Sequence, residues 1–389
     1  PSWNHHLTVV EGFGCPNDPR SYVVGGGLPL EGRPANHSRI SYAVMFDAGS
    51  TGTRIHVYTF IQSESVELPV LDNEMFHSVK PGLSAYADSP EMAGHTVRML
   101  LKVAKKTVPH LEWKRTPVVL RATAGLRLLP AEKAQALLDQ IQHVFDESPF
   151  LVPDKSVSIM NGTNEGILAW ISVNFLTGEY SKTKNTVGIL DLGGGSTQIT
   201  FLPKLRKTIE SVPAADYVAR FDIFNTTFEL YTYSSCLPKK FRDEWSFGGL
   251  TYQVSGDSDG YTGYKTCYQE VLKVVKGIIH QPFELEDNTV FYAFSYYYDR
   301  AVDAGGVQRG VLKVRDFKKR AKEVCNKMTK SPPASSFLCM DLTYITCLLK
   351  DGFGFKETTV LQLTKKVNNV ESSWALGAVL DHLHNLKIH

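Results

Sequence analysis

The chain has 389 residues, of which 43% are hydrophobic and 21% are charged, and these proportions are ordinary for a globular protein. Its 42 basic and 40 acidic residues give a formal net charge of +2, which does not favour nucleic acid or an anionic membrane as the main partner. No apolar run approaches the roughly 18–20 residues that a membrane-spanning helix needs. The length is sufficient for two substantial cores.

Residues 1–39 are rich in Gly, Pro, Asn and His and show no sustained periodicity. This composition predicts a loosely held N-terminal arm. The chain starts at Pro1 instead of Met, and we expect that a signal or anchor segment has been removed or left out.

The cysteines and glycosylation sequons indicate an oxidising compartment. None of the cysteines forms a C-x-x-C pair or lies at zinc-ligand spacing from a histidine; they are Cys15, Cys236, Cys267, Cys325, Cys339 and Cys347. N-x-S/T sequons occur at Asn36, Asn161 and Asn225. Together these features favour the endoplasmic reticulum lumen or the secreted state, with glycosylation at Asn225. The sequence shows no Lys-Asp-Glu-Leu type tail, so it does not distinguish between these two locations.

The segment Val44–Tyr58 reads as an apolar strand, a tight turn of small residues and a second strand. Asp47 closes the first strand, and the turn behind it contains Ala, Gly, Ser and Thr residues and leads to Arg54. Glycines let backbone N–H groups approach an anion closely, and a carboxylate can hold a divalent cation against that anion. A single turn of this kind is weak evidence, because many such turns bind no ligand.

The segment Val187–Phe201 repeats this plan, with a strand that ends in Asp191 and a turn of three glycines followed by Ser196 and Thr197. Two such hairpins facing each other across a cleft would hold a chain of phosphates and share one metal ion between their carboxylates. An internal repeat at this distance predicts two related lobes.

Helices and strands alternate between the two hairpins. Ser89 and Pro90 begin a helix that extends to about Val108. A strand at 117–120, a helix at 131–146 and a strand at 156–160 follow, and this alternation predicts an α/β lobe with parallel pairing. The next helix begins at Asn161–Gly166 and ends before Gly178. Glu165 therefore lies in its first turn, where a glutamate commonly complements the helix dipole and needs no ligand.

Helices are predicted at 268–279, 316–327 and 342–350 in the second half. The aromatic run 291–298 suits a buried strand or helix, although one tyrosine at a cleft edge could stack on a nucleobase. The segment Asp351–Phe355 reads as a flexible aromatic loop that could do the same. An amphipathic helix at 371–380 is expected to return to the first lobe.

Five segments, in this order, resemble the signature regions of the apyrase family, the nucleoside triphosphate diphosphohydrolases. These segments are Asp47–Arg54, Ala122–Arg127, Asn161–Gly166, Asp191–Gln198 and Ser373–Gly377. The resemblance is strongest to the soluble type 5 branch, with type 6 next, and the segments Lys80–Tyr86 and Phe291–Arg300 carry this assignment.

The resemblance implies an α/β fold of two ribonuclease-H-like lobes of the actin/Hsp70-like superfamily, with the active-site cleft between them. We expect an arm at 1–39, a first lobe at 40–163 that is completed by 365–389, and a second lobe at 164–364. It also implies that a monomer hydrolyses the terminal phosphate of nucleoside diphosphates, UDP and GDP above all, with Ca²⁺ or Mg²⁺.

The resemblance further assigns roles to individual residues. Glu165 corresponds to the general base, and the residues that position the attacking water or the metal's water shell are Thr123, Ser196 and Gln198. Asp47 and Asp191 correspond to the pair that holds the hydrated metal, with Trp374 beside it. The phosphate-binding loops contain Ser50, Thr51, Gly52, Thr53, Gly193, Gly194 and Gly195. Tyr296 and Tyr297 are the candidates for base contacts.

In this branch Cys236 and Cys267 resemble one disulfide and Cys325 and Cys339 the other, which leaves Cys15 and Cys347 unpaired. One departure from the family pattern follows Tyr231–Ser234, where a segment of some tens of residues normally precedes the Cys-Leu-Pro that is here at 236–238. The two ends are joined almost directly, and this makes the base contacts harder to assign.

Two other readings are open. A sugar-kinase or polyphosphatase relative would share the two-loop fold, but a kinase needs an acceptor pocket and usually an Asp base. A non-catalytic nucleotide-binding module, like an actin-like or chaperone ATPase domain, would bind tightly with negligible turnover. The Glu165 motif favours water as the acceptor.

Overall fold

The computed structural model describes residues 39–62, 69–179, 185–223, 226–236, 264–276, 279–283, 285, 289–305, 310–328 and 337–385. The predicted arm at 1–39, Cys15 and Asn225 therefore lie almost entirely outside the described residues, as does the side chain of Cys236. Within these ranges no helix combines the length and the apolar character that crossing a bilayer requires.

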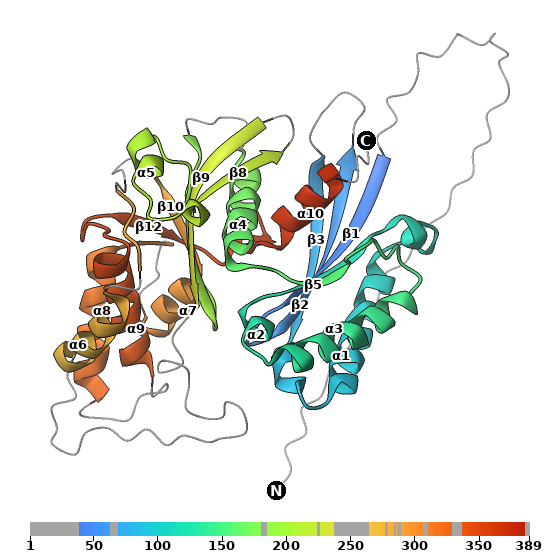
Figure 1. The fold of residues 1–389 in the computed structure, drawn as a ribbon, viewed down its shortest axis with the longest axis horizontal. Coiled ribbons are helices and arrows are strands. Elements are labelled where there is room, and N and C mark those ends of the chain that lie inside the picture. The colour runs from blue at the N-terminus through green and yellow to red at the C-terminus, as the bar shows by residue number, and fades with distance from the viewer. Residues whose placement is uncertain are drawn as a thin grey trace, which may run out of the picture. The chain divides into compact units, whose positions relative to one another are not determined.

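A five-stranded sheet, here the first sheet, contains the first hairpin (Figure 1). Its order is β3-β2-β1-β4-β5, where β1 pairs antiparallel with β2 and parallel with β4. The strands are β1 Arg39–Ala48, β2 Thr53–Gln62, β3 Val70–Val79, β4 Val118–Ala122 and β5 Val157–Ile159. The sheet is thus a meander extended by two parallel strands, as the alternation of strands and helices predicts.

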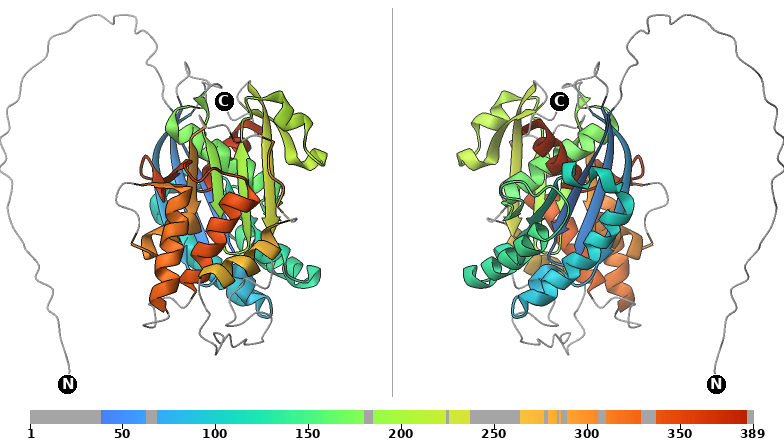
Figure 2. Two further views of the ribbon diagram at one scale, coloured as in Figure 1. Left: turned by 90° about the vertical axis from the view of Figure 1, so that its left-hand side faces the viewer. Right: turned by 90° about the vertical axis from the view of Figure 1, so that its right-hand side faces the viewer.

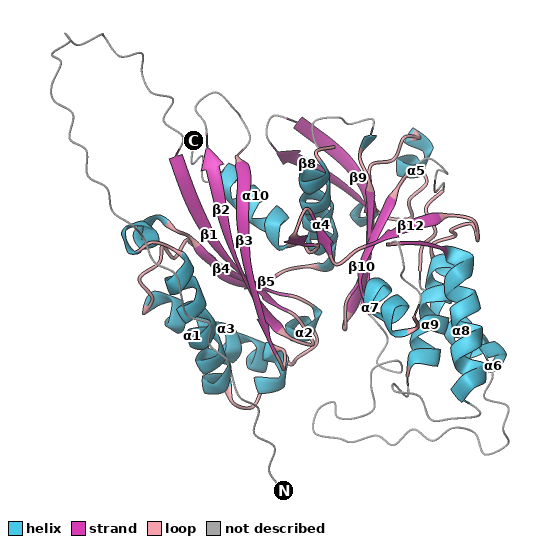
Figure 3. Ribbon diagram, turned by 180° about the vertical axis from the view of Figure 1, so that it is seen from behind, coloured by secondary structure: helices cyan, strands magenta, loops and turns pink. Residues whose placement is uncertain are grey.

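Helices cover both faces of the first sheet. On one face, α1 (Pro90–Thr107) and α3 (Ala131–Asp146) bury Val44 and Phe46 of β1 (Figure 3). On the other face, α4 (Gly162–Thr177) and α10 (Ala375–Asn385) bury Ala43 and Met45. The alternation of β1 side chains between the two faces is the period of two expected for a strand. The helix predicted at 131–146 agrees with α3, and α10 returns to β1 as expected.

The second sheet has seven strands in the order β11-β12-β10-β6-β7-β9-β8. They are β6 Gly188–Leu192, β7 Ser196–Phe201, β8 Val218–Ile223, β9 Thr226–Cys236, β10 Phe291–Ser295, β11 Val311–Lys313 and β12 Val360–Leu363. Helices α6 (Tyr264–Val275), α8 (Val314–Met328) and α9 (Leu338–Cys347) lie together on one side of it (gold and orange in Figure 2). The remaining elements are the short helices α2 Ala124–Arg127, α5 Arg206–Glu210 and α7 Tyr296–Asp303, and the two-stranded ribbon β13 Lys366–Val367 with β14 Val370–Glu371.

The two sheets share one topology. In the second sheet β6, β7 and β9 form an antiparallel meander, and β10 and β12 continue it with parallel pairing. The set β6-β7-β9-β10-β12 therefore repeats β1-β2-β3-β4-β5 in order and direction. The internal repeat that the two hairpins indicate in the sequence therefore includes all five strands of the first sheet and five of the seven strands of the second.

Helix α4 is buried on nearly every side. Ile167 and Leu168 are buried, and so are Trp170, Ser172 and Asn174, because α4 packs against β6, β7 and β9 of the second sheet as well as α10. A helix that is apolar all round is typical of such an enclosed position. Gly178, in the left-handed region at φ 72°, ends the helix where the glycine predicts.

The structure differs from the sequence-based predictions in the second half. Helices α6 and α9 each begin four residues early, at Tyr264 and Leu338. The predicted flexible loop at 351–355 is instead packed, since Phe353 and Phe355 are buried and their rings meet edge to face. The aromatic run divides into β10 and α7.

One of the two expected disulfides is present. Cys325 of α8 is bonded to Cys339 of α9, and Cys347 is a free, buried thiol as expected. The bridge between Cys236 and Cys267 is not formed, because Cys267 is a free thiol. Helix α6 directs the Cys267 thiol toward Thr343 of α9, whereas Cys236 ends β9 opposite Ser196.

Candidate active site

Two aspartates occupy matching positions in the two hairpins. Asp47 of β1 pairs with Arg54 of β2, and Asp191 of β6 pairs with Gln198 of β7. Both residues are buried, with 4% and 7% of their surface exposed. The charge of Asp47 acts on Asp191, and burial is the main reason why the pKa of Asp191 rises to about 6. The two carboxylates therefore belong to one site.

Glu165 is the third carboxylate of this site. It lies in the first turn of α4, where the Asn161 side chain accepts a hydrogen bond from the backbone N–H of Asn164 at 2.7 Å. Burial raises the pKa of Glu165 to about 8, the charges of Asp191 and Asp47 raise it further, and Arg127 opposes the rise. Glu165 therefore lies close enough to both aspartates for their charges to act on it.

Arg127 hydrogen-bonds to residues of both helix α4 and strand β7. Its guanidinium donates to Glu165 Oε2 from Nη1 at 3.3 Å and from Nη2 at 3.2 Å. It also donates to the Met160 carbonyl at 2.5 Å and to Ser196 Oγ of β7 at 3.4 Å. The sequence places Arg127 in a motif, but we assigned it no role, since only the tertiary fold brings it to Glu165.

The polar residues predicted to position water line the same site. Ser196 and Gln198 are buried, and Gln198 Nε2 donates to Ser196 Oγ at 3.0 Å and to Ser234 Oγ at 3.2 Å. Gln198 Oε1 is buried without a partner among the described residues. Thr123 follows β4, and its N–H donates to Ala48 at 3.2 Å, next to Asp47. Buried polar atoms of this kind require a ligand or water.

Sequence reasoning also missed Arg54 and Ser295. Arg54 Nη1 donates to Asp47 Oδ2 at 2.8 Å. Ser295, at the end of β10, has a left-handed backbone (φ 57°), and its side chain hydrogen-bonds to Asp191. A non-glycine residue in this region is strained, and such strain is concentrated at functional sites. The junction of strand and helix in the aromatic run is the signal that could have located Ser295.

The two turns lie against each other. A Cβ atom on Gly194 would come within 2.5 Å of Thr51 Cγ2 and 2.7 Å of Ser50 Oγ, and a Cβ on Gly195 within 2.8 Å of the Ala124 Cβ. Any side chain at Gly194 would therefore collide with the first turn. Glycine here leaves room for backbone donors to approach an anion.

The site contains oxygen ligands suited to a hard cation. Asp47 Oδ1 and Asp191 Oδ1 are buried and have no partner in the described part of the chain. Carboxylate oxygens are the ligands that Ca²⁺ and Mg²⁺ prefer, and Mg²⁺ usually keeps several waters. Among the described residues no group of three or more His, Cys, Asp or Glu side chains is arranged so that it could by itself hold a metal ion. The donor set therefore fits an ion held by two carboxylates and water.

The aromatic candidates have different surroundings. Tyr297 is completely buried in the core beneath the second sheet, so its ring offers no face to a base. Tyr296 is half-buried, and the Arg300 guanidinium lies 4.9 Å from its ring centre. Trp374 is buried immediately before α10, in the core that α4 shares with both sheets.

Comparison with known proteins gives a family. The GDA1/CD39 (nucleoside phosphatase) family model matches residues 34–236 and 233–389. The two matched stretches overlap at residues 233–236. This is the place where a segment of the family pattern is missing from the sequence. The ectonucleoside triphosphate diphosphohydrolase 5 of Gallus gallus is 56% identical over 380 residues, which cover 89% of this chain and 88% of that protein.

Two further relatives agree with the order that the motifs predict. The Homo sapiens nucleoside diphosphate phosphatase ENTPD5 is 53% identical over 380 residues, covering 89% of this chain and 88% of that protein. The Mus musculus ectonucleoside triphosphate diphosphohydrolase 6 is 46% identical over 390 residues, covering 92% and 85%. The predicted resemblance, with type 5 ahead of type 6, is confirmed.

Solved structures support the fold. The nucleoside triphosphate hydrolase structure from Neospora caninum superposes with a TM-score of 0.63 at 12% identity, covering 90% of this chain and 93% of that chain. An exopolyphosphatase-like protein superposes with a TM-score of 0.53 at 13% identity, covering 90% and 99%. The predicted α/β fold is confirmed by these superpositions and by the two sheets of the structure. The chain belongs to the GDA1/CD39 nucleoside phosphatase family.

Proposed function

We propose that this enzyme hydrolyses the terminal phosphate of nucleoside diphosphates, UDP and GDP above all, to a monophosphate and inorganic phosphate. The observation that carries the proposal is the meeting of Asp47, Asp191 and Glu165 beside two glycine-rich turns. The printed names of the type 5 relatives, one of which is a nucleoside diphosphate phosphatase, support the substrate class.

The cofactor in this proposal is Ca²⁺ or Mg²⁺. The family generally depends on a divalent metal, and the unpartnered Oδ1 atoms of Asp47 and Asp191 would hold the ion largely through its water shell. When bound, the ion neutralises charge on the phosphate oxygens. The turns at 50–53 and 193–195 would orient the phosphates with hydroxyl and backbone donors.

Glu165 would act as the general base in this mechanism. It would take a proton from the attacking water as the new P–O bond forms and the bond to the nucleoside monophosphate breaks. Its pKa of about 8 without metal lies near the neutral pH at which a base is most effective. Thr123, Ser196 and Gln198 would hold the water in line, and Arg127 would orient Glu165.

Location and assembly are part of the same proposal. We place the protein in the endoplasmic reticulum lumen or outside the cell, and the Cys325–Cys339 disulfide supports an oxidising compartment. We propose that the monomer is active, because one chain supplies all the groups named above. Within it, residues 40–163 with 365–389 would form one lobe and 164–364 the other.

Phosphate release from a substrate panel tests the function. The substrates are UDP, GDP, ADP, UTP, ATP and pyrophosphate, each with Ca²⁺, Mg²⁺ or a chelator. We expect release from UDP and GDP with a metal and none with the chelator. Tight nucleotide binding without release would instead identify a non-catalytic module, and preference for pyrophosphate would favour a polyphosphatase.

A variant of Glu165 tests the mechanism. We expect Glu165→Gln to lower kcat by about 10²–10⁴-fold, the usual contribution of a general base, while circular dichroism shows the fold intact. Glu132→Gln is the matched control, since Glu132 is also in the first turn of a helix, α3. Near-normal turnover by Glu165→Gln would reject this role.

A further inference from the structure

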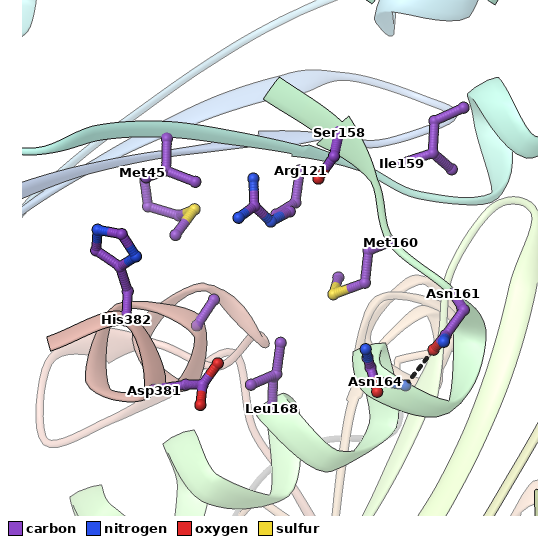
Figure 4. Close-up of a pocket in the computed structure, with 12 residues that line it drawn as sticks. Met45, Arg121, Ser158, Ile159, Met160, Asn161, Asn164, Leu168, Asp381 and His382 are labelled. Carbon is purple, nitrogen blue, oxygen red and sulfur yellow. Dashed lines mark hydrogen bonds between the residues drawn. The ribbon is translucent and has the colours of Figure 1, made fainter. Parts of the chain in front are cut away.

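A cavity of about 420 Å³ lies on the face of the first sheet that carries Met45 (Figure 4). Strands β1, β4 and β5 form one wall, and α4 and α10 form the other. Met45 precedes Asp47 by two residues on β1, so the cavity begins one side chain below the aspartate. Its volume is within the roughly 300–1,000 Å³ of small-ligand sites.

Arg121 provides the cavity with a cationic group. Figure 4 shows its side chain projecting from β4 between the sheet and the two helices. Its Nη1 donates to the carbonyls of Leu120, Lys155 and Ser156 at 3.1, 3.0 and 3.0 Å, which fixes the guanidinium plane. Burial lowers the pKa of Arg121 from its usual range and the charge of Asp381 opposes this shift, but an arginine stays charged. Nε and Nη2 remain as donors for a ligand.

Polar groups from both helices face the same space. His382 of α10 has a buried Nε2 atom with no partner among the described residues. Burial and the charge of Arg121 lower the pKa of His382, which favours the neutral ring, and a neutral imidazole can donate or accept a hydrogen bond at Nε2. Asn164 enters from the first turn of α4, and Leu168 and Met160 supply apolar surface (Figure 4).

We propose that this cavity is a second binding site, which takes a small organic oxyanion: a carboxylate or phosphate monoester on a short apolar body. A guanidinium fixed at one nitrogen pairs well with such a head group, and the methionines and Leu168 match the body. Asp381 lies across the cavity from Arg121 (Figure 4), and its charge favours a ligand with few negative charges over a nucleoside diphosphate.

The cavity is connected to Glu165 through one segment. The Met160 side chain lines the cavity, while its carbonyl accepts the 2.5 Å hydrogen bond from Arg127, which also binds Glu165. Asn161, the next residue, caps α4. A shift of Met160 on ligand binding would therefore move the carbonyl that accepts the hydrogen bond from Arg127. The inferred effect of the ligand on turnover rests on the proposed role of Glu165, whereas binding to the cavity does not.

Calorimetry with hexanoate and hexyl phosphate, in the absence of nucleotide, tests the binding. 1-Hexanol and hexylammonium are the neutral and cationic counterparts of the same length. We expect Arg121→Gln to weaken binding of the anions by about tenfold to a hundredfold, the usual loss for one charge-assisted hydrogen bond. Ala378→Leu, which fills the cavity from α10, should weaken it similarly. Arg98→Gln, at an arginine paired with Glu147 on the surface, should leave it unchanged.

The outcomes separate the possibilities. Binding of hexanoate or hexyl phosphate that both cavity variants weaken supports the site, and the stronger of the two identifies the head group. Failure of both anions to bind, equal binding by the variants, or equally tight binding of 1-hexanol would overturn it. Ala378→Leu decides the test if Arg121→Gln does not fold.

Turnover of UDP tests the coupling. We expect saturating hexanoate to change kcat of the wild type and not that of Ala378→Leu. Binding without any change in kcat would refute the connection to Glu165. Since binding is measured without nucleotide, a failure of the proposed function gives a different result, namely intact binding and no turnover of UDP in any variant.

Discussion

The carboxylates of the site are buried, and their negative charges repel one another. Burial and the neighbouring aspartates raise the pKa of Glu165 to about 8, and burial raises that of Asp191 to about 6. Arg127 is the cation that opposes the rise at Glu165. The protonation of Glu165 therefore depends on both a metal ion and this arginine.

Removal of the Arg127 charge should change the pH dependence of activity. We expect Arg127→Gln to move the acidic limb of kcat/KM for UDP to higher pH, because Glu165 loses the group that stabilises its ionised form. The profile is measured from pH 4.5, the ordinary pKa of Glu165, to well above its raised pKa of about 8. Arg115→Gln, at an exposed arginine, should leave the limb in place. An unshifted limb in Arg127→Gln would contradict this role.

Burial of Glu165 should also make stability depend on pH. The raised pKa means that the folded state holds a proton that the unfolded state releases between pH 4.5 and about 8. The contribution to stability is therefore complete below pH 4.5 and is lost as the pH rises toward 8. We expect the free energy of unfolding of metal-free protein to fall by a few kcal/mol over this range, at about 1.4 kcal/mol per pKa unit.

Urea unfolding of wild type and Glu165→Gln in chelator measures this slope. The variant should lose most of the fall, because glutamine has no proton to release. Asp191, whose pKa is also raised, should leave a smaller slope of the same sign below about pH 6. Parallel curves for the two proteins would show that Glu165 does not titrate in this range.

Helices α4 and α10 are in close contact. Gly377 of α10 lies against the Leu168 backbone of α4, and a Cβ there would overlap the Leu168 carbonyl oxygen. The Gly377 N–H also donates to Ser172 Oγ at 2.7 Å. The small residues of the Ser373–Gly377 motif therefore let these two connecting helices touch.

Gly377→Ala should separate the helices and destabilise the protein by about 1–3 kcal/mol, the usual cost of overpacking. Gly94→Ala is the matched control, since Gly94 lies in α1 and its Cβ would meet only the flexible Gln140 side chain. Helix propensity alone would make both variants more stable by about 1 kcal/mol. Thermal unfolding that shows a gain in Gly377→Ala would refute the close contact.

Local sequence patterns predicted the helices whose position depends on residues near them in the chain. The end of α4 follows from Gly178, and α3 follows from its apolar spacing. The two hairpins were found because glycines and aspartates recur at the same spacing. Boundaries failed where tertiary packing decides, as in α6 and α9. Tyr264 and Cys267 before the predicted start of α6 are partly buried against the core, and Leu338 before that of α9 is buried in it.

Contacts that join distant segments were not visible in the sequence. Arg127 reaches Glu165 across 38 residues, and only the placement of α2 beside α4 brings them together. Tyr296 and Tyr297 are neighbours in an aromatic run, yet the turn of α7 buries Tyr297 completely and leaves Tyr296 half-buried. The pairing of Cys267 failed for the same reason, because its thiol faces α9.

At the scale of the molecule, the two sheets each supply one carboxylate for the proposed metal site. An ion that binds only the folded state stabilises it, by about 2.7 kcal/mol at a hundred times its dissociation constant. We therefore expect Ca²⁺ or Mg²⁺ to raise the melting temperature and a chelator to reverse the rise. The effect should disappear in Asp191→Asn and persist in Asp139→Asn, at an exposed residue of α3. A melting temperature insensitive to both ions would exclude this site.

The duplication of the hairpins is not a perfect copy. The position opposite the aspartate is Arg54 in one hairpin and Gln198 in the other, so only the first carries its own positive charge. A strictly twofold clamp would accept a diphosphate in either orientation. In the proposed mechanism the unequal partners would remove that ambiguity, because the phosphate nearer Arg54 would meet a positive charge that the second hairpin lacks at the matching position.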